Sequence, residues 1–232
     1  MASWMIHLRI ADRLLDQIPG LDKTAFVIGN IAPDSGVPNA DWSAYSPPKD
    51  VSHYKVRRGN ESFFDLDRFI SEHFSPERIR SYSLRAFSFF LGYYAHLLTD
   101  IRWTETILAA LIRDYPEECT KDKIKLIETA KEDWYDLDFL YLKQHPDFRA
   151  FSIFEKAEGF VNEFMDIFSR DAFDNRRQYI CGFYRSEEHG ELHRPYRYLT
   201  VDRADAFVKD TVGEIIYTLC QGVHRHNRFN VE

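Results

Sequence analysis

Apolar residues recur at steps of three and four along most of this chain, and this spacing restricts its fold more than any other feature. The first segment carries one such stripe: Trp4, His7, Leu8, Ala11, Leu14, Leu15 and Ile18. Ser3 precedes the stripe as a capping residue, and Pro19-Gly20 follows it as a stop signal. A second stripe lies near the C-terminus: Ala204, Phe207, Val208, Thr211, Val212, Ile215, Ile216 and Leu219. This period predicts amphipathic helices.

The rest of the chain and the second stripe itself complete an all-α prediction. Helices are predicted over 61–73, 76–112, 120–143, 152–170 and 202–221. The 76–112 segment is so long that we expect it to bend or break. Residues 36–59 contain Pro38, Pro47 and Pro48 and predict a long surface loop, and no segment shows the alternation typical of strands. The sequence therefore predicts a single-domain helical bundle over residues 1–232, with this Pro-containing loop near the functional site.

Charge, cysteines and the N-terminal segment limit the possible partners and compartments. The net charge of −7 argues against unselective binding to nucleic acid, so no stable nucleic-acid complex is expected. Cys119, Cys181 and Cys220 form no C-x-x-C pair and suggest free thiols in a reducing compartment. The start, MASWMIHLRIADRLL, does not have the pattern of a signal peptide, and no transmembrane segment is predicted. These features favour a cytoplasmic protein.

Two polar residues interrupt the apolar run FFLGYYAHLLTDIRW, residues 89–103. His96 and Asp100 lie one helical turn apart and share a face, and Gly92 lies one turn before them, where it would allow a close approach. Burying a charge is costly unless the charge is paired or bound to a metal. For this pair alone, a hydrogen-bonded core network is the more common situation.

Three further residues favour a metal site over a hydrogen-bonded core network. His7 lies within the apolar stripe of the first segment, Asp34 lies in the constrained turn of GNIAPDSG, and His53 lies in the long loop. Each of them alone is ordinary. Together with His96 and Asp100 they form a set of three imidazoles and two carboxylates, which are ligands that Zn²⁺ prefers. The sequence therefore predicts a metal site.

With these residues in place, the sequence resembles the zinc-dependent phospholipase C family, part of a superfamily that also contains zinc-dependent single-strand-specific nucleases. The motifs that carry the resemblance are WMIHLRIA, VIGNIAPDSG, SHYK and LGYYAHLLTDIRW. Their order and separation match over about the first 105 residues, and the element H-L-L-T-D is the most specific of them.

The resemblance implies a helical fold and hydrolysis of phosphate esters by a metal-activated water. It also implies metal ligation by His7, Asp34, His53, His96 and Asp100. Asp100 would bridge two ions, and Asp34 would also have a catalytic role by orienting the water. The expected cofactor is zinc, with two ions, although another first-row divalent ion would suit the same ligands. The expected substrate is a small phosphoester, either a lipid head group or a nucleotide.

The sequence departs from the family pattern at two places. The family uses the amino group and carbonyl of a mature N-terminal tryptophan as ligands, whereas Trp4 is internal here. The family also takes ligands for another zinc ion from a histidine soon after the bridging aspartate and from a later helix. The acidic residues available for such a role are Glu105, Glu132, Asp133, Asp136 and Asp138. For Glu132 and Asp136, a solvent-exposed acidic face is an equally good interpretation.

Two alternative functions remain. The first is a metal-binding helical module that acts as a scaffold or sensor without catalysis, which the incomplete second ligand set would explain. The second is a metal-dependent phosphohydrolase of the HD type, which ranks lower because the chain contains no adjacent His-Asp pair.

Overall fold

A computed structural model describes residues 1–41, 43–59, 61–186 and 188–227 of the chain, with the backbone alone at 58, 61 and 222–227. Helices account for 68% of the structure and strands for 5%, which confirms the all-α prediction. The first part of the chain forms α1 (Trp4–Gln17), α2 (Lys23–Ile31) and the 3-10 turn η1 (Ala32–Asp34). Ser3 caps α1 as predicted, because its hydroxyl accepts a hydrogen bond from the Ile6 amide.

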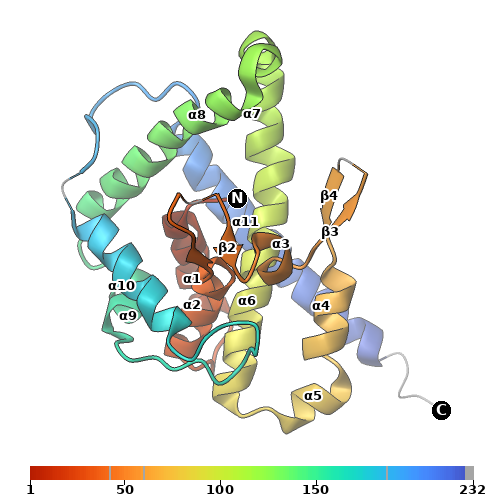
Figure 1. Cartoon of the computed structure of the whole chain (residues 1–232). Coiled ribbons are helices and arrows are strands. Elements are labelled where there is room, and N and C mark those ends of the chain that lie inside the picture. Colours follow the sequence, from red (N-terminus) through yellow and green to blue (C-terminus); the bar gives the residue numbers. More distant parts are fainter. Residues whose placement is uncertain (42, 60, 187, 228–232) are drawn as a thin grey trace.

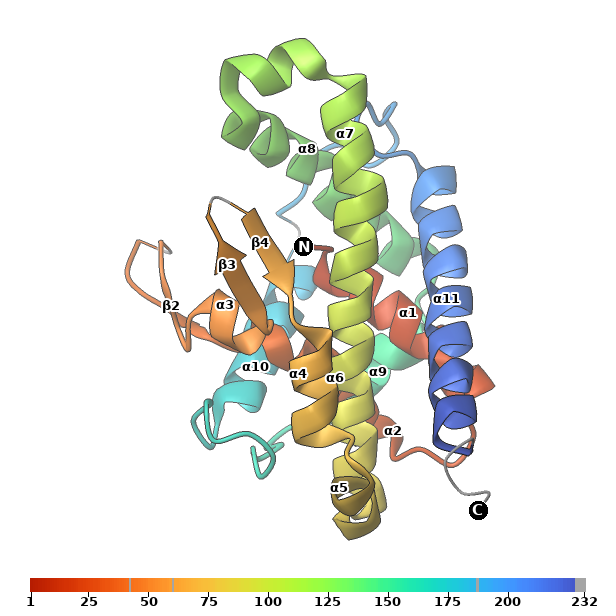
Figure 2. The ribbon, with the colours of Figure 1, turned by 90° about the vertical axis from the view of Figure 1, so that its right-hand side faces the viewer.

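The long helix α6 (Leu84–Trp103) runs through the molecule, and α1 and α2 pack against it (Figures 1 and 2). The contact between α2 and α6 is the most extensive between any two elements in the part of the chain that the structure describes. Gly29 and Gly92 lie at this crossing, where a β-carbon on Gly92 would fall on the Phe26 carbonyl oxygen and only 2.8 Å from the Asn30 amide nitrogen. The close approach predicted at Gly92 is therefore confirmed, and α2 is the element that makes it.

The predicted 76–112 helix breaks and bends. It divides into α5 (Pro76–Ser81), α6, the π-helical turn η2 (Thr104–Leu108) and α7 (Ala109–Asp114). Ser83 begins α6, because its hydroxyl caps the amide of Ala86. From α6 through α7 the chain continues as one long rod, with α11 (Val201–Asn227) alongside (Figure 2).

Four short strands are present in the described chain, although the sequence shows no alternation typical of strands. β1 (Val37–Pro38) pairs with β2 (Tyr45–Ser46), and β3 (Lys55–Arg58) pairs with β4 (Glu61–Phe64), both antiparallel. The predicted 36–59 loop therefore contains β1, β2, β3 and the short helix α3 (Lys49–Ser52). The predicted 61–73 helix is β4 at its start and becomes helical only as α4 (Leu66–His73). Strands of two to four residues are too short to show a period of two.

The C-terminal half also departs from the prediction. Helix α8 (Pro116–Gln144) extends beyond the predicted 120–143 segment and has a kink at Asp122. The predicted 152–170 helix is only α9 (Arg149–Lys156), followed by irregular chain. Helix α10 (Ala172–Arg185) was missed, because Arg176 and Arg177 occupy two positions of its buried face and interrupt the apolar stripe.

The buried apolar side chains form one cluster, which extends from Ala2 to Ile215. This continuity fits a single all-α domain, and the bounds 1–232 stay a prediction. Among the described residues, no helix combines the length and the apolar character that crossing a membrane requires.

Candidate metal centre

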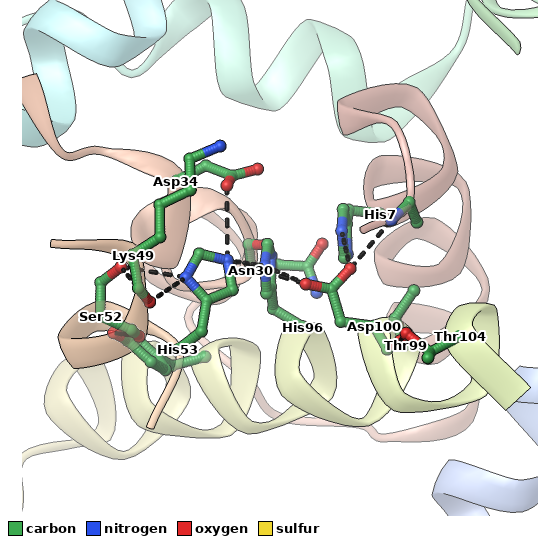
Figure 3. Close-up of polar contacts among 12 residues, drawn as sticks. His7, Asn30, Asp34, Lys49, Ser52, His53, His96, Thr99, Asp100 and Thr104 are labelled. Atoms are coloured by element: carbon green, nitrogen blue, oxygen red, sulfur yellow. Dashed lines mark hydrogen bonds and ion pairs between the residues drawn. The ribbon is translucent and has the colours of Figure 1, made fainter. Parts of the chain in front are cut away.

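The structure brings together all five residues predicted as metal ligands. His7 comes from α1, Asp34 ends η1, His53 follows α3 directly, and His96 and Asp100 lie one turn apart on α6. Figure 3 shows these side chains pointing toward one another. His7, His53 and Asp100 are fully buried, and His96 is 1% exposed. A site that collects buried groups from four elements is formed only when the chain is folded.

The ligand-type atoms form two groups that share His96. One consists of His7, His96 and Asp100, the other of Asp34, His53 and His96, and within each group the atoms lie within 4.8 Å of one another. His7 and His96 also stack face to face, with ring centroids 3.8 Å apart. Because α6 contributes to both groups, it is the element on which the whole site depends.

The separations within the site are those expected of ligands around one ion. Two atoms bound about 2.1 Å from a tetrahedral zinc ion lie about 3.4 Å apart. The Asp34 Oδ1 to His53 Nε2 and His7 Nε2 to Asp100 Oδ1 distances are both 3.4 Å. His53 Nε2 lies 3.3 Å from His96 Nε2, and Asp100 Oδ2 lies 3.6 Å from His96 Nε2 and 3.7 Å from His53 Nε2. The residues present therefore fit zinc.

Several of these atoms have no hydrogen-bond partner. Both ring nitrogens of His7 and Oδ2 of Asp100 are buried without one in the described structure, although His7 Nε2 faces Asp100 Oδ1 and Asp100 Oδ2 faces His96 Nε2. Unpaired buried polar atoms are costly, and each one needs an explanation. A cation held between them would provide that explanation.

Hydrogen bonds at the opposite ring nitrogens orient two of the imidazoles. His96 Nδ1 lies 2.8 Å from the Asn30 carbonyl oxygen, to which it donates, so that Nε2 faces the site as an acceptor. His53 Nδ1 lies 3.0 Å from the Ser52 hydroxyl and 3.1 Å from the Lys49 carbonyl oxygen. Such contacts fix the tautomer and the ring plane of a metal-ligating histidine.

The backbone around His53 is also held in place. The Tyr93 hydroxyl of α6 donates a hydrogen bond to the Ser52 carbonyl oxygen. Tyr54 adopts a left-handed conformation with a φ of 51°, which is uncommon for a residue other than glycine. Packing keeps Tyr54 there, because its side chain is buried and its ring contacts Phe69 and Tyr93. The chain can therefore turn into β3 immediately after His53.

Burial and neighbouring charges set the ionisation of the site. Burial lowers the pKa of His7 to about 4 and also lowers that of His53. Burial alone would raise the pKa of Asp34 and Asp100, but contacts with the histidines outweigh it and hold both pKa values below the ordinary range. At neutral pH the site therefore offers carboxylates and neutral imidazoles at His7 and His53, which are the forms that bind metal.

Residues 6–103 match the family model of zinc dependent phospholipase C. This region of the chain is similar to that family. The match includes all five predicted metal ligands and ends at Trp103, the last residue of α6. The resemblance noted in the sequence is thereby confirmed. No curated protein and no solved structure matches the chain significantly.

The five later acidic candidates lie outside both ligand groups of the candidate metal centre. Glu105 pairs with Arg102, and Glu132 is exposed. Asp133, Asp136 and Asp138 are buried, so the alternative of a solvent-exposed acidic face was right for Glu132 and wrong for Asp136. Arg194 bridges Asp133 and Asp136, at 2.6 and 2.8 Å. These two carboxylates fasten the segment after α10 to α8.

Asp138 has a different environment, next to the start of the chain. Its carboxylate accepts hydrogen bonds from the Ser3 and Tyr184 hydroxyls, at 2.9 and 2.7 Å. Burial raises its pKa to about 7, because the two hydrogen bonds and the more distant Arg9 offset only part of the desolvation. In the unfolded chain the same carboxyl has a pKa of 3.8. The folded state therefore holds a proton that the unfolded state releases between about pH 4 and pH 7.

Asp138→Asn should accordingly change the pH dependence of stability. Since the unfolded chain binds fewer protons at this position, wild-type stability falls as pH rises through this range. The variant does not lose this stability. From pH 5 to pH 8, the difference in unfolding free energy between variant and wild type should therefore shift by roughly 2.5 kcal/mol in favour of the variant. Urea denaturation of both proteins at the two pH values measures the difference. An equal difference at both pH values would mean that Asp138 ionises normally.

Residues that support the site were not predicted from the sequence. Asn30 and Ser52 lie inside motifs that were recognised, but they act through a backbone carbonyl or a neighbouring hydroxyl, which no spacing reveals. Lys49 extends toward Asp34 in Figure 3. Its positive charge lowers the pKa of the Asp34 carboxyl, although less than the contacts with the histidines do. Its only sequence signal was its place in the Pro-containing segment.

Proposed function

We propose that this protein is a zinc-dependent phosphodiester hydrolase of the phospholipase C type, with His7, Asp34, His53, His96 and Asp100 as metal ligands. The observation that carries the proposal is the pair of buried ligand groups that share His96, with separations suited to a tetrahedral ion. Membership of residues 6–103 in a zinc-dependent family supports the choice of metal.

The chain's own residues would position the reaction. Asp100 presents Oδ1 to His7 and Oδ2 to His53 and His96, so its two oxygens face the two ligand groups and suit a bridging role. The Ala2 amide donates to Oδ1 at 2.9 Å and fixes the carboxylate. Bound zinc would supply the Lewis acidity that lowers the pKa of water and offsets charge on phosphoryl oxygens.

Asp34 is the residue to which we assign a further catalytic role. Its side chain is 7% exposed, while the side chains of His53 and Asp100 are fully buried. It also lines a cavity that opens to solvent. A carboxylate at the boundary between the ligands and this cavity could accept a hydrogen bond from an attacking water and orient it.

Asp34→Asn tests this assignment. The substitution keeps the size of the side chain and removes its negative charge, so kcat for bis(4-nitrophenyl) phosphate should fall at least about 100-fold, with a much smaller change in KM. Hydrolysis by the wild type should stop with chelator and return with zinc. Asp50→Asn, on α3 in the same region, serves as the matched control and should stay within about twofold of wild type. A metal-replete, folded protein that hydrolyses no phosphoester would contradict the proposal.

One observation favours the non-catalytic alternative. Within the described chain, the acidic residues considered for another metal ion lie outside both ligand groups. Metal content separates the two functions: two tightly bound zinc ions per chain favour the enzyme, and one favours a structural site.

A further inference from the structure

A cavity of about 380 Å³ opens beside Asp34 and is large enough for a small organic ligand. Its walls come from widely separated parts of the chain. Trp4 of α1, Tyr45 of β2 and Lys49 of α3 line one part, and Lys131 and Tyr135 of α8 line another. Helix α10 contributes Arg176, Tyr179 and Phe183. Asp34 connects this cavity to the proposed metal site.

The charges in the cavity are unequal. Three cationic side chains line it, Lys49, Lys131 and Arg176, against the single carboxylate of Asp34. Across the described residues, no carboxylate lies within ion-pair distance of any of the three cations. The cavity therefore holds positive charge that the protein itself does not neutralise.

Arg176 is the most informative of these cations because it is only 7% exposed. Its guanidinium donates one hydrogen bond, of 2.6 Å, to the Gly36 carbonyl oxygen. It also lies 5.4 Å from the ring centroid of Tyr179 and 5.9 Å from that of Trp4. A buried guanidinium is costly without a carboxylate or another anion. Its planar fork of donors suits phosphate.

A single scissile phosphodiester accounts for only part of this charge. It carries one negative charge and would lie next to the ligands on η1, α3 and α6. Lys131 and Arg176 come from α8 and α10, which carry none of the five proposed ligands. Aromatic faces between these cations, such as those of Tyr135 and Tyr179, could cover the rest of the substrate.

We infer that this cavity selects phosphodiesters that carry a second anionic group, such as a phosphomonoester, over those with a cationic head group such as choline. Lys131 and Arg176 hold that second group, and Asp34 marks the end where the scissile phosphate lies. The inference rests on the proposed function and names its substrate class.

A matched pair of chromogenic substrates tests the selection. Thymidine 5′-(4-nitrophenyl phosphate) and its 3′-phosphorylated form release the same nitrophenol and differ only in the distant phosphate. Because hydrogen bonds to charged groups contribute strongly, kcat/KM for the 3′-phosphorylated substrate should be at least about tenfold higher. Wild-type hydrolysis of both substrates at equal efficiency would overturn the inference while leaving the proposed function intact.

Two variants assign the effect to residues. Arg176→Gln and Lys131→Gln should each lower the ratio of the two kcat/KM values severalfold. Lys131 is exposed, so its variant should fold even if the buried Arg176 cannot be replaced. Lys125→Gln, also exposed on α8 but outside the cavity, is the matched control and should retain the wild-type ratio. An unchanged ratio in the Lys131 and Arg176 variants would overturn the assignment to these cations.

Binding measured without turnover separates this inference from the proposed function. Calorimetric titration of the wild-type protein with thymidine 3′,5′-bisphosphate and with thymidine 5′-monophosphate should give at least about tenfold tighter binding of the bisphosphate. Selective binding without hydrolysis would support the cavity's preference and count against the enzyme. Equal binding of both nucleotides would count against the preference.

Discussion

Replacing His96 and Asp100 together by alanine should leave the protein without bound zinc and without phosphodiester hydrolysis. His96 belongs to both ligand groups, and Asp100 contacts His7, His53 and His96, so the double substitution removes a ligand from every part of the site. Zinc content should fall from about two ions per chain to about none. Elemental analysis of the purified proteins measures this change.

The matched control replaces another histidine and aspartate. His145 and Asp147 are both exposed and belong to neither ligand group. Their double alanine variant should keep the zinc content and the activity of the wild type. Circular dichroism of both variants verifies that the helices remain. Wild-type zinc in a folded His96→Ala/Asp100→Ala protein would place the metal elsewhere.

Gly92→Ala should strongly destabilise the helical core. The new β-carbon would overlap the Phe26 carbonyl oxygen, so α2 and α6 must move apart. We expect a loss of roughly 3 kcal/mol or more in the free energy of unfolding, because backbone atoms cannot give way as a side chain can. Chemical denaturation measures this loss.

The same substitution should also reduce zinc binding, because Asn30 of α2 orients His96 across this crossing. Gly182→Ala is the control. Gly182 also lies within a helix, α10, but a β-carbon there meets nothing within 4 Å. That variant should gain up to about 1 kcal/mol, since alanine restricts the unfolded chain more than glycine does. Equal effects of the two substitutions would mean that the helix crossing tolerates a side chain.

The proposed ligands could be picked out in the sequence because polar residues occupy apolar or constrained positions. His7, His96 and Asp100 interrupt apolar helical stripes and Asp34 lies in a constrained turn, so residues that are ordinary alone suggest a metal site together. The helices that carry them follow from periodicity. Gly92 was recognisable for the same reason, since it lies on the face shared with His96.

The cavity walls could not be predicted in this way. Trp4, Lys131 and Arg176 meet only through tertiary packing, and each is an ordinary residue in its own segment. On α10, arginines at buried positions interrupt the apolar stripe, so the sequence did not predict the helix. The charges of the buried Asp133 and Asp136 are evident from the sequence, but the residue that pairs with them is not. Their partner, Arg194, lies about 60 residues further along the chain, in a segment without regular secondary structure.

The proposed ligands and part of the cavity wall come from different regions of the chain, and this affects how related proteins can differ in substrate. The proposed ligands all lie before Thr104, whereas five of the lining residues come from α8 and α10, beyond the region that matches the family. Substitutions on these two helices can change what the cavity accepts without moving a ligand. Relatives that share residues 6–103 can therefore differ in substrate, and the C-terminal half of each one is where its preference should be sought.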